Sequence, residues 1–230
     1  MIGPQAEVVA RVPGAAALGL LPSGGAVGVR AADLADPDRL AGLLAARARA
    51  GSLRVHATVW WYSASAVLLA PVLAGLAVGR PLSGRPAETT VFLDSGGVPL
   101  AAVSSALDGD PAGGLRACLD AFVPALAAVA GMRARPLWAI AADSMANGLL
   151  ALGRTLGDVP AVTALAGPLA TAVGSPLPVP RYTDVDGVRF VRRVSCCLVD
   201  RLPHGSTCLS CPRRPPVERR TLLEDAAARS

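Results

Sequence analysis

Residues 193–212 read RVSCCLVDRLPHGSTCLSCP, and this stretch holds four of the five cysteines in the 230-residue chain. Cys196 and Cys197 are adjacent, and ten residues later Cys208 and Cys211 follow with two residues between them. Four thiolates brought together are typical ligands of an iron–sulfur cluster or of a zinc ion. The pattern therefore predicts a small metal-binding module at this end of the chain.

The adjacent pair distinguishes between the two kinds of metal. On a regular strand neighbouring side chains point to opposite faces, so Cys196 and Cys197 can both be ligands only if the strand ends or bends there. Structural zinc sites use two spaced pairs, whereas a two-iron cluster presents binding positions that are farther apart. Geometry favours an iron–sulfur cluster and leaves zinc open. His204 is not expected to be a ligand, because four thiolates are already available.

Two segments, RVSCCL at 193–198 and CLSCP at 208–212, resemble the C-terminal signature of the FhuF-type ferric-siderophore reductases in their spacings and in the flanking Arg and Pro. The resemblance covers residues 189–212, and Leu209 stands where family members often carry Gly. It implies that the chain binds a [2Fe-2S] cluster and passes one electron to siderophore-bound Fe(III), releasing Fe(II). The implied cofactor and metal ligands are Cys196, Cys197, Cys208 and Cys211, with no catalytic residue beyond the cluster.

The resemblance also implies the partners. These are a ferric siderophore and an external electron donor, a ferredoxin or a reductase; the cytoplasm is expected because the sequence shows no secretory signal. The sequence carries no glycine-rich nucleotide-binding motif, which agrees with electrons arriving from a partner. A start without a basic segment followed by an apolar run predicts no secretory signal, so a reducing compartment is expected.

Two alternatives stay open at this point. One is a zinc-stabilised, non-enzymatic binding protein whose basic tail contacts nucleic acid or another protein. The other is an iron–sulfur electron carrier with an acceptor other than a siderophore. The favoured interpretation expects no nucleic-acid partner.

The C-terminal part of the chain is basic. From Arg181 to Arg220 there are nine arginines and four acidic residues. Such a field can offset the negative charge of a thiolate-bound cluster or attract an anionic ligand. The candidates for this role are Arg192, Arg193, Arg201 and Arg213.

The expected fold is mainly α with minor β (α+β). We predict a mostly helical, siderophore-binding body at 1–173, a Pro-rich linker at 174–180 and a [2Fe-2S]-binding module with a basic tail at 181–230. Cap and Pro signals and apolar spacing predict the elements of the chain after residue 30. These are helices from Asp36-Pro37 to Gly51, from Asp110-Pro111 with a kink or break at Pro124, from Pro136 toward Gly153, and a weaker one over 159–173.

Turn chemistry predicts two β-hairpins. The first joins 89–93 to 98–103. The second joins 182–185 to 188–194 through Asp186-Gly187, and its second strand is expected to run directly into Cys196. No prediction is made for the first thirty residues.

Other residues have plainer interpretations. The uncharged segment Ala57–Gly79 is predicted to be a buried or interface-lying helix, and peripheral membrane contact is left open. Cys118 is expected to be a buried, inert thiol, and His56 a residue at a helix boundary. Core packing is favoured over a ligand pocket for Trp60, Trp61, Tyr62 and Trp138, and a solvated helix face for Asp143 and Asn147.

Overall fold

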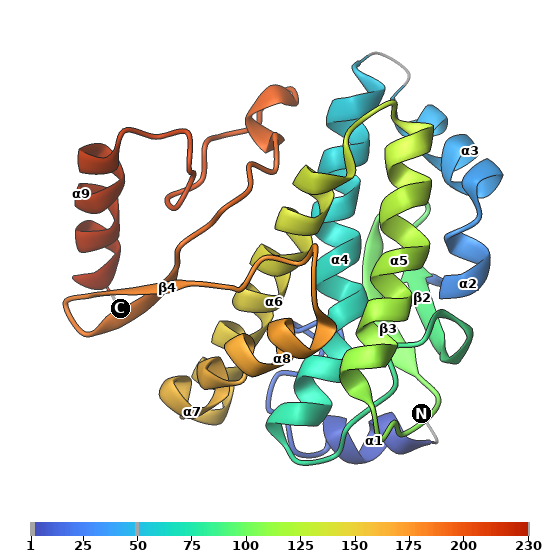
Figure 1. The fold of residues 1–230 in the computed structure, drawn as a ribbon, viewed down its shortest axis with the longest axis horizontal. Helices are drawn as coiled ribbons and strands as arrows, with labels where there is room; N and C mark the ends of the chain where they lie inside the picture. Colours follow the sequence, from blue (N-terminus) through green and yellow to red (C-terminus); the bar gives the residue numbers. More distant parts are fainter. Residues whose placement is uncertain (1–2, 49–50, 230) are drawn as a thin grey trace.

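The structure, a computed structural model, describes residues 3–48 and 51–229, and it is mainly α with minor β, as predicted (Figure 1). The helices are α1 Pro4–Val9, α2 Ala31–Leu34, α3 Pro37–Arg47, α4 Leu53–Ala77, α5 Pro111–Val129, α6 Ala134–Leu156, α7 Val159–Ala164, α8 Ala166–Val173 and α9 Pro216–Ala227. Short 3-10 turns are η1 Pro86–Glu88 and η2 Val199–Arg201. The strands are β1 Val27–Arg30, β2 Thr89–Leu93, β3 Pro99–Ser104, β4 Tyr182–Val185 and β5 Val188–Val191.

Helix α4 lies at the centre of the helical layer and packs against α6, α5 and α3 (Figure 1). Trp60 and Trp61 are buried and contact the ring of Phe122 at centroid distances of 6.5 and 5.9 Å. The Trp61 indole N–H donates to the Leu137 carbonyl of α6 at 2.8 Å. This confirms the prediction of core packing for both tryptophans and of a buried helix for this segment.

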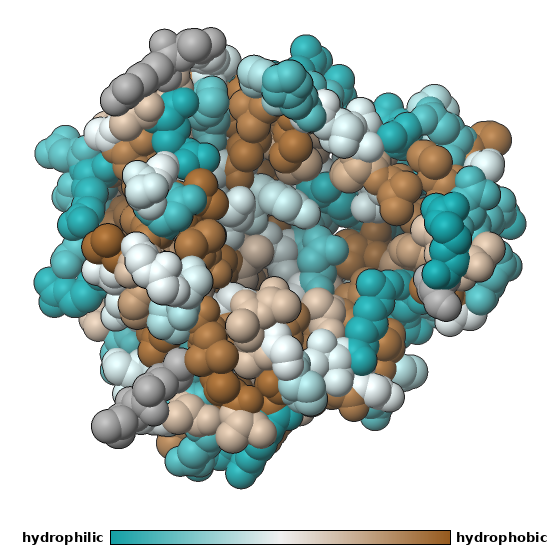
Figure 2. All heavy atoms as spheres, turned by 180° about the vertical axis from the view of Figure 1, so that it is seen from behind, coloured by the Kyte–Doolittle hydropathy of each residue, from teal (hydrophilic) through white to brown (hydrophobic). Residues whose placement is uncertain are grey.

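Two helices are long and apolar enough to cross a membrane by length and composition, α4 and α5. In α4, however, 67% of the apolar window is buried inside the fold, and in α5 44%. On the face of the molecule in Figure 2, exposed apolar atoms are interspersed with polar ones. Helix α4 is therefore long and apolar because it lies in the core of the fold.

A three-stranded antiparallel sheet, β1-β2-β3, lies behind α5 in Figure 1. The β2–β3 hairpin confirms the prediction, and the Asp94 carboxylate accepts from the N–H groups of Gly96 and Val98 within its turn. Strand β1 and helix α1 belong to the first thirty residues, for which the sequence carries no clear periodicity. They complete the edge of the sheet and cover its end.

The predicted helix starts are confirmed at their caps. The Asp36 carboxylate accepts from the N–H groups of Asp38 and Arg39 at the start of α3, and Asp110 accepts from Gly113 at the start of α5. These carboxylates satisfy N–H groups that have no partner within the helix.

The predicted helix ends and breaks are less accurate. Helix α3 ends at Arg47 rather than Gly51, and α5 continues through Pro124, so that helix is not split. Helix α6 continues past Gly153 to Leu156 and ends at Gly157, which has φ 76°. A Cβ at Gly153 would lie 2.8 Å from the Val159 Cα, so Gly153 lets α7 approach rather than ending α6.

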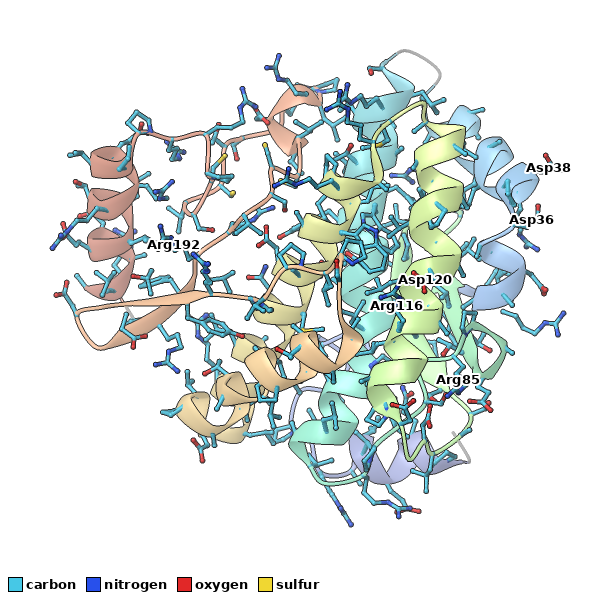
Figure 3. All side chains as sticks on the ribbon, in the orientation of Figure 1. Asp36, Asp38, Arg85, Arg116, Asp120 and Arg192 are labelled. Atoms are coloured by element: carbon cyan, nitrogen blue, oxygen red, sulfur yellow. The ribbon has the colours of Figure 1, made fainter. Side chains whose placement is uncertain are left out.

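Residues 174–180 form no helix, as predicted, and they are held against the body. The Arg116 guanidinium of α5 donates to the Ser175 carbonyl at 2.6 Å and pairs with Asp120, as Figure 3 shows for the two labelled side chains. The Leu177 side chain is buried. The division of the chain into body, linker and module remains a prediction.

The buried Gln5 side chain connects α1 to the sheet, and its removal is our first prediction. Its amide donates to the Leu20 and Ala102 carbonyls at 2.8 and 2.9 Å and accepts from the Ser104 N–H at 2.6 Å. Gln5→Leu leaves these buried backbone groups without partners, so we expect it to lower the free energy of unfolding by about 2–4 kcal/mol.

Urea denaturation measures this loss. The matched control is Glu7→Gln in the same helix, where a partly exposed ion pair with Arg80 contributes less than about 1 kcal/mol. Equal stability of the Gln5 and Glu7 variants would contradict the prediction.

Candidate metal centre

The chain leaves the hairpin before it reaches the cysteines. Strand β5, the second strand of the hairpin, ends at Val191. The prediction that this strand runs directly into Cys196 is therefore wrong. The physical reason is a competing acceptor. The N–H groups of Val194 and Ser195 bond to a carboxylate of α6 instead of a neighbouring strand.

That carboxylate is Asp143, and its position corrects the prediction of a solvated helix face. The side chain is 3% exposed. Oδ1 accepts from the Val194 N–H at 3.0 Å, and Oδ2 accepts from the Ser195 N–H at 2.9 Å and from the Ser195 hydroxyl at 2.5 Å. Asp143 thus fixes the backbone immediately before Cys196. One feature of the sequence could have indicated this role: Asp143 is the single acidic residue of α6, and most of its neighbours there are small or apolar.

Arg193 lies between Asp143 and the sulfur atoms. Its side chain is 4% exposed, and its Nε is 3.5 Å from Asp143 Oδ2. Its Nη1 donates to Cys208 Sγ at 3.1 Å and to Cys197 Sγ at 3.8 Å. The guanidinium carbon lies 5.0 Å from the ring centroid of Tyr62, a favourable cation–π distance. Tyr62, predicted to be a core residue, therefore also borders the site.

The cysteine pairs are turned toward each other by the loop between them. Leu198 has φ 57°, which redirects the chain directly after Cys197 and lets the adjacent cysteines leave the strand geometry. The hydrogen bond between the Cys197 and Cys208 thiols lowers the pKa of Cys197 to about 5 and raises the pKa of Cys208, whereas the charge of Arg193 acts to lower both. Metal ligation requires the thiolate, so among these contacts Arg193 is the one that favours the metal-binding form of both cysteines.

The four candidate arginines separate into two groups. Arg193 donates to two sulfurs, and Arg213 pairs with Asp200 at 2.8 Å while its positive charge lies near Cys196. Arg201 is 60% exposed and lies 3.9 Å from Asp200, and Arg192 lies on the segment after the hairpin (Figure 3). Arg193 and Arg213 therefore place positive charge beside the cysteine sulfurs, and no contact of Arg192 or Arg201 with a sulfur is found among the described residues.

The donor set can be compared with the two metals left open by the sequence. Within residues 3–48 and 51–229, no three His, Cys, Asp or Glu side chains gather around a point that one ion could occupy. The cysteine sulfur atoms, yellow in Figure 3, lie in the loops between the hairpin and α9, and no disulfide joins cysteines among the described residues. Zinc and a two-iron cluster would both take the thiolates of these loops as ligands.

Arg193 provides a second test of this fit. Its Nη2 is buried and has no hydrogen-bond partner among the described residues. A buried N–H without an acceptor costs about 1–3 kcal/mol or more. A cluster held by thiolates carries negative charge and sulfide acceptors, so the residues present fit such a group.

The remaining predicted residues have other surroundings. Cys118 is buried, as predicted, and desolvation raises the pKa of its thiol to about 12. Asn147 donates to the Asp143 carbonyl at 2.8 Å, and Trp138 is 5% exposed beside Arg116. His204 lies in the loop between the two cysteine pairs and has φ 62°.

Comparison with known proteins identifies the module. Residues 193–213 match the model of the FhuF 2Fe-2S C-terminal domain, and they include Arg193, the four cysteines and Arg213. No curated protein matches the chain. The chain therefore carries a FhuF-type 2Fe-2S domain at residues 193–213, and this domain implies a [2Fe-2S] cluster as its cofactor.

Proposed function

We propose that the protein is a ferric-siderophore reductase that acts in the cytoplasm. The observation that carries the proposal is a FhuF-type four-cysteine site with a buried arginine directed at its sulfurs. Cys196, Cys197, Cys208 and Cys211 would hold the cluster, which when bound would supply one electron to siderophore-held Fe(III) and so give Fe(II), which the chelator binds more weakly. A chelator lowers the potential of its iron by about 59 mV for each tenfold preference for Fe(III) over Fe(II).

The residues of the chain have separate roles in this proposal. Asp143 positions the backbone of residues 194 and 195, and through it the first cysteine pair. Arg193 and Arg213 place positive charge and N–H donors beside the sulfurs, which stabilises the added negative charge on reduction. The Arg193 side chain is buried between Asp143 and Tyr62, so its N–H groups are already directed at the sulfurs before reduction.

Part of the cysteine site is exposed to solvent, so an electron donor and an acceptor can approach it. Cys196 and Cys208 are partly exposed, whereas Cys197 and Cys211 are buried. Leu209, between the second pair, is 43% exposed. Electrons would come from an external ferredoxin or reductase, in keeping with the lack of a nucleotide-binding motif in the sequence.

A mixing experiment tests the proposal. The anaerobic, dithionite-reduced protein is mixed with a ferric siderophore, and its reoxidation is followed by visible absorption while an Fe(II) chelator records the product. We expect reoxidation to be much faster than in buffer, with Fe(II) appearing at the same rate.

The control is Cys208→Ser, which removes one ligand and should abolish cluster loading and Fe(II) release. Reoxidation of the normal protein at the buffer rate with every ferric chelate tested would exclude the reductase function. It would favour an electron carrier with another acceptor.

A further inference from the structure

The hydrogen bonds of Arg193 fix its buried guanidinium only in part. Nη1 lies 3.1 Å from Cys208 Sγ, but its contact with Cys197 Sγ at 3.8 Å is longer. The contact of Nε with Asp143 Oδ2, at 3.5 Å, is long for an N–H···O hydrogen bond. Nη2 has no hydrogen-bond partner among the described residues. The direction of the guanidinium toward the sulfurs therefore depends also on the groups that pack against its faces.

The ring of Tyr62 packs against one face of this guanidinium. The guanidinium carbon lies 5.0 Å from the ring centroid, closer than the 5.9 Å of the contact between Arg189 and Tyr182 in the hairpin. The Arg193 side chain is only 4% exposed, and a cation–π contact is stronger where water is excluded. The ring therefore holds the plane of the guanidinium, which the hydrogen bonds leave partly free.

Tyr62 is itself fixed by the interface between α4 and α6. In the next turn of α4, the buried Ser65 hydroxyl forms a 2.7 Å hydrogen bond with the Ser144 hydroxyl of α6. Ser144 directly follows Asp143, which contacts Arg193 from the second helix. The packing of α4 on α6 therefore sets the separation of the ring and the carboxylate that hold the guanidinium.

We infer that Tyr62 is a positioning residue of the cluster: its ring keeps the Arg193 N–H groups directed at the sulfurs and so raises the reduction potential. Tyr62 lies outside residues 193–213, which match the FhuF-type domain. A helix of the body thus takes part in setting the redox property of the module. The inference rests on the cluster that this domain implies, and it holds for any electron acceptor.

Two substitutions of Tyr62 separate the ring face from the hydroxyl. Tyr62→Leu keeps apolar volume but removes the ring, so the Arg193 N–H groups stabilise the reduced cluster less well. In the full-length, cluster-loaded protein, we expect the potential to fall by about 40 mV, a fivefold change in the one-electron equilibrium. Tyr62→Phe keeps the ring face and should leave the potential nearly unchanged. Anaerobic redox titration followed by EPR measures both.

The matched control is Tyr182→Leu, which removes the other tyrosine ring that faces an arginine. Arg189 bonds to Asp184 and Thr163 rather than to a sulfur, so the potential should not change. This variant also loses the hydrogen bond from the Tyr182 hydroxyl to the Ala146 carbonyl. A loss of stability without a change in potential is therefore the expected behaviour of a merely structural tyrosine.

A double variant tests whether Tyr62 acts through Arg193. In the Arg193→Met background, Tyr62→Leu should cause no further change in potential, because the group that the ring positions is absent. A general disturbance of the site would instead give the same shift in both backgrounds. If Tyr62→Leu retains too little cluster for titration, Tyr62→Met, whose longer side chain fills more of the space of the ring, gives the same comparison.

Three results would each overturn the inference. They are an unchanged potential in the loaded Leu and Met variants, an equal fall in Tyr62→Phe, and a full shift in the Arg193→Met background. These titrations contain no ferric chelate, so their outcome is independent of the reductase test. A protein that reduces no ferric siderophore but shows the predicted shifts would uphold the role of Tyr62 and reject the proposed function.

Discussion

Asp143→Asn is expected to release the cysteine module from α6 and to cause most of the cluster to be lost during purification. The carboxylate accepts from two backbone N–H groups and one hydroxyl, and it balances the charge of Arg193. An asparagine has only one acceptor oxygen. Its amide N–H₂ group would lie against N–H and O–H donors of residues 194 and 195, with which it cannot form the same hydrogen bonds. Breaking a buried ion pair by removing one partner typically costs about 3–5 kcal/mol.

Iron and sulfide content and the temperature at which the visible absorption is lost measure this effect. The matched control is Asp184→Asn in the β4–β5 hairpin, because Asp184 is also paired with an arginine, Arg189, but is 55% exposed. Its effect should be below about 1 kcal/mol. A full cluster content in the Asp143 variant would show that the carboxylate does not hold the module.

Arg193→Met is expected to lower the reduction potential of the cluster by about 60 mV or more, a tenfold change in the one-electron equilibrium. Methionine retains much of the apolar volume of the arginine stem but removes the donors to Cys197 and Cys208. Loss of positive charge and of hydrogen bonds to the sulfurs disfavours the reduced, more negative state. Arg192→Met, one residue earlier in the chain, is the control and should leave the potential nearly unchanged.

Anaerobic redox titration followed by EPR gives the potential of each variant. An unchanged potential in a cluster-loaded Arg193 variant would contradict the role given to its N–H groups. The double variant Asp143→Asn/Arg193→Met separates the two residues further. Because it leaves neither charge buried alone, its loss of stability should be smaller than the sum of the two single losses.

The sequence predicted the local elements well, because their signals are local. Asp36-Pro37 and Asp110-Pro111 start helices where expected, and Asp186-Gly187 forms the turn of the second hairpin with positive φ at both residues. The cysteine spacing favoured an iron–sulfur cluster and left zinc open, and the resemblance of residues 189–212 to the FhuF-type signature implied a [2Fe-2S] cluster, with which the comparison of residues 193–213 agrees.

The contacts between segments distant in sequence could not be predicted. Asp143 bonds to residues 51 and 52 positions later, and nothing in a helical pattern indicates such a partner. The same holds for Gln5, whose partner at Ser104 is 99 positions away. In the sequence Gly153 looks like the end of a helix. In the structure it lies within α6, where the missing side chain leaves room for the backbone of Val159. Arg193 was one of four equivalent candidates until its burial distinguished it.

The most direct test of the account is spectroscopic analysis of the anaerobically purified, full-length protein. We predict equal amounts of iron and acid-labile sulfide, visible absorption from the oxidised protein, and an EPR signal from a half-integer spin after reduction by one electron. Replacement of any of Cys196, Cys197, Cys208 and Cys211 by serine should change this signal or remove it, whereas Cys118→Ser should leave it intact. A colourless protein that contains zinc and no iron would contradict the account.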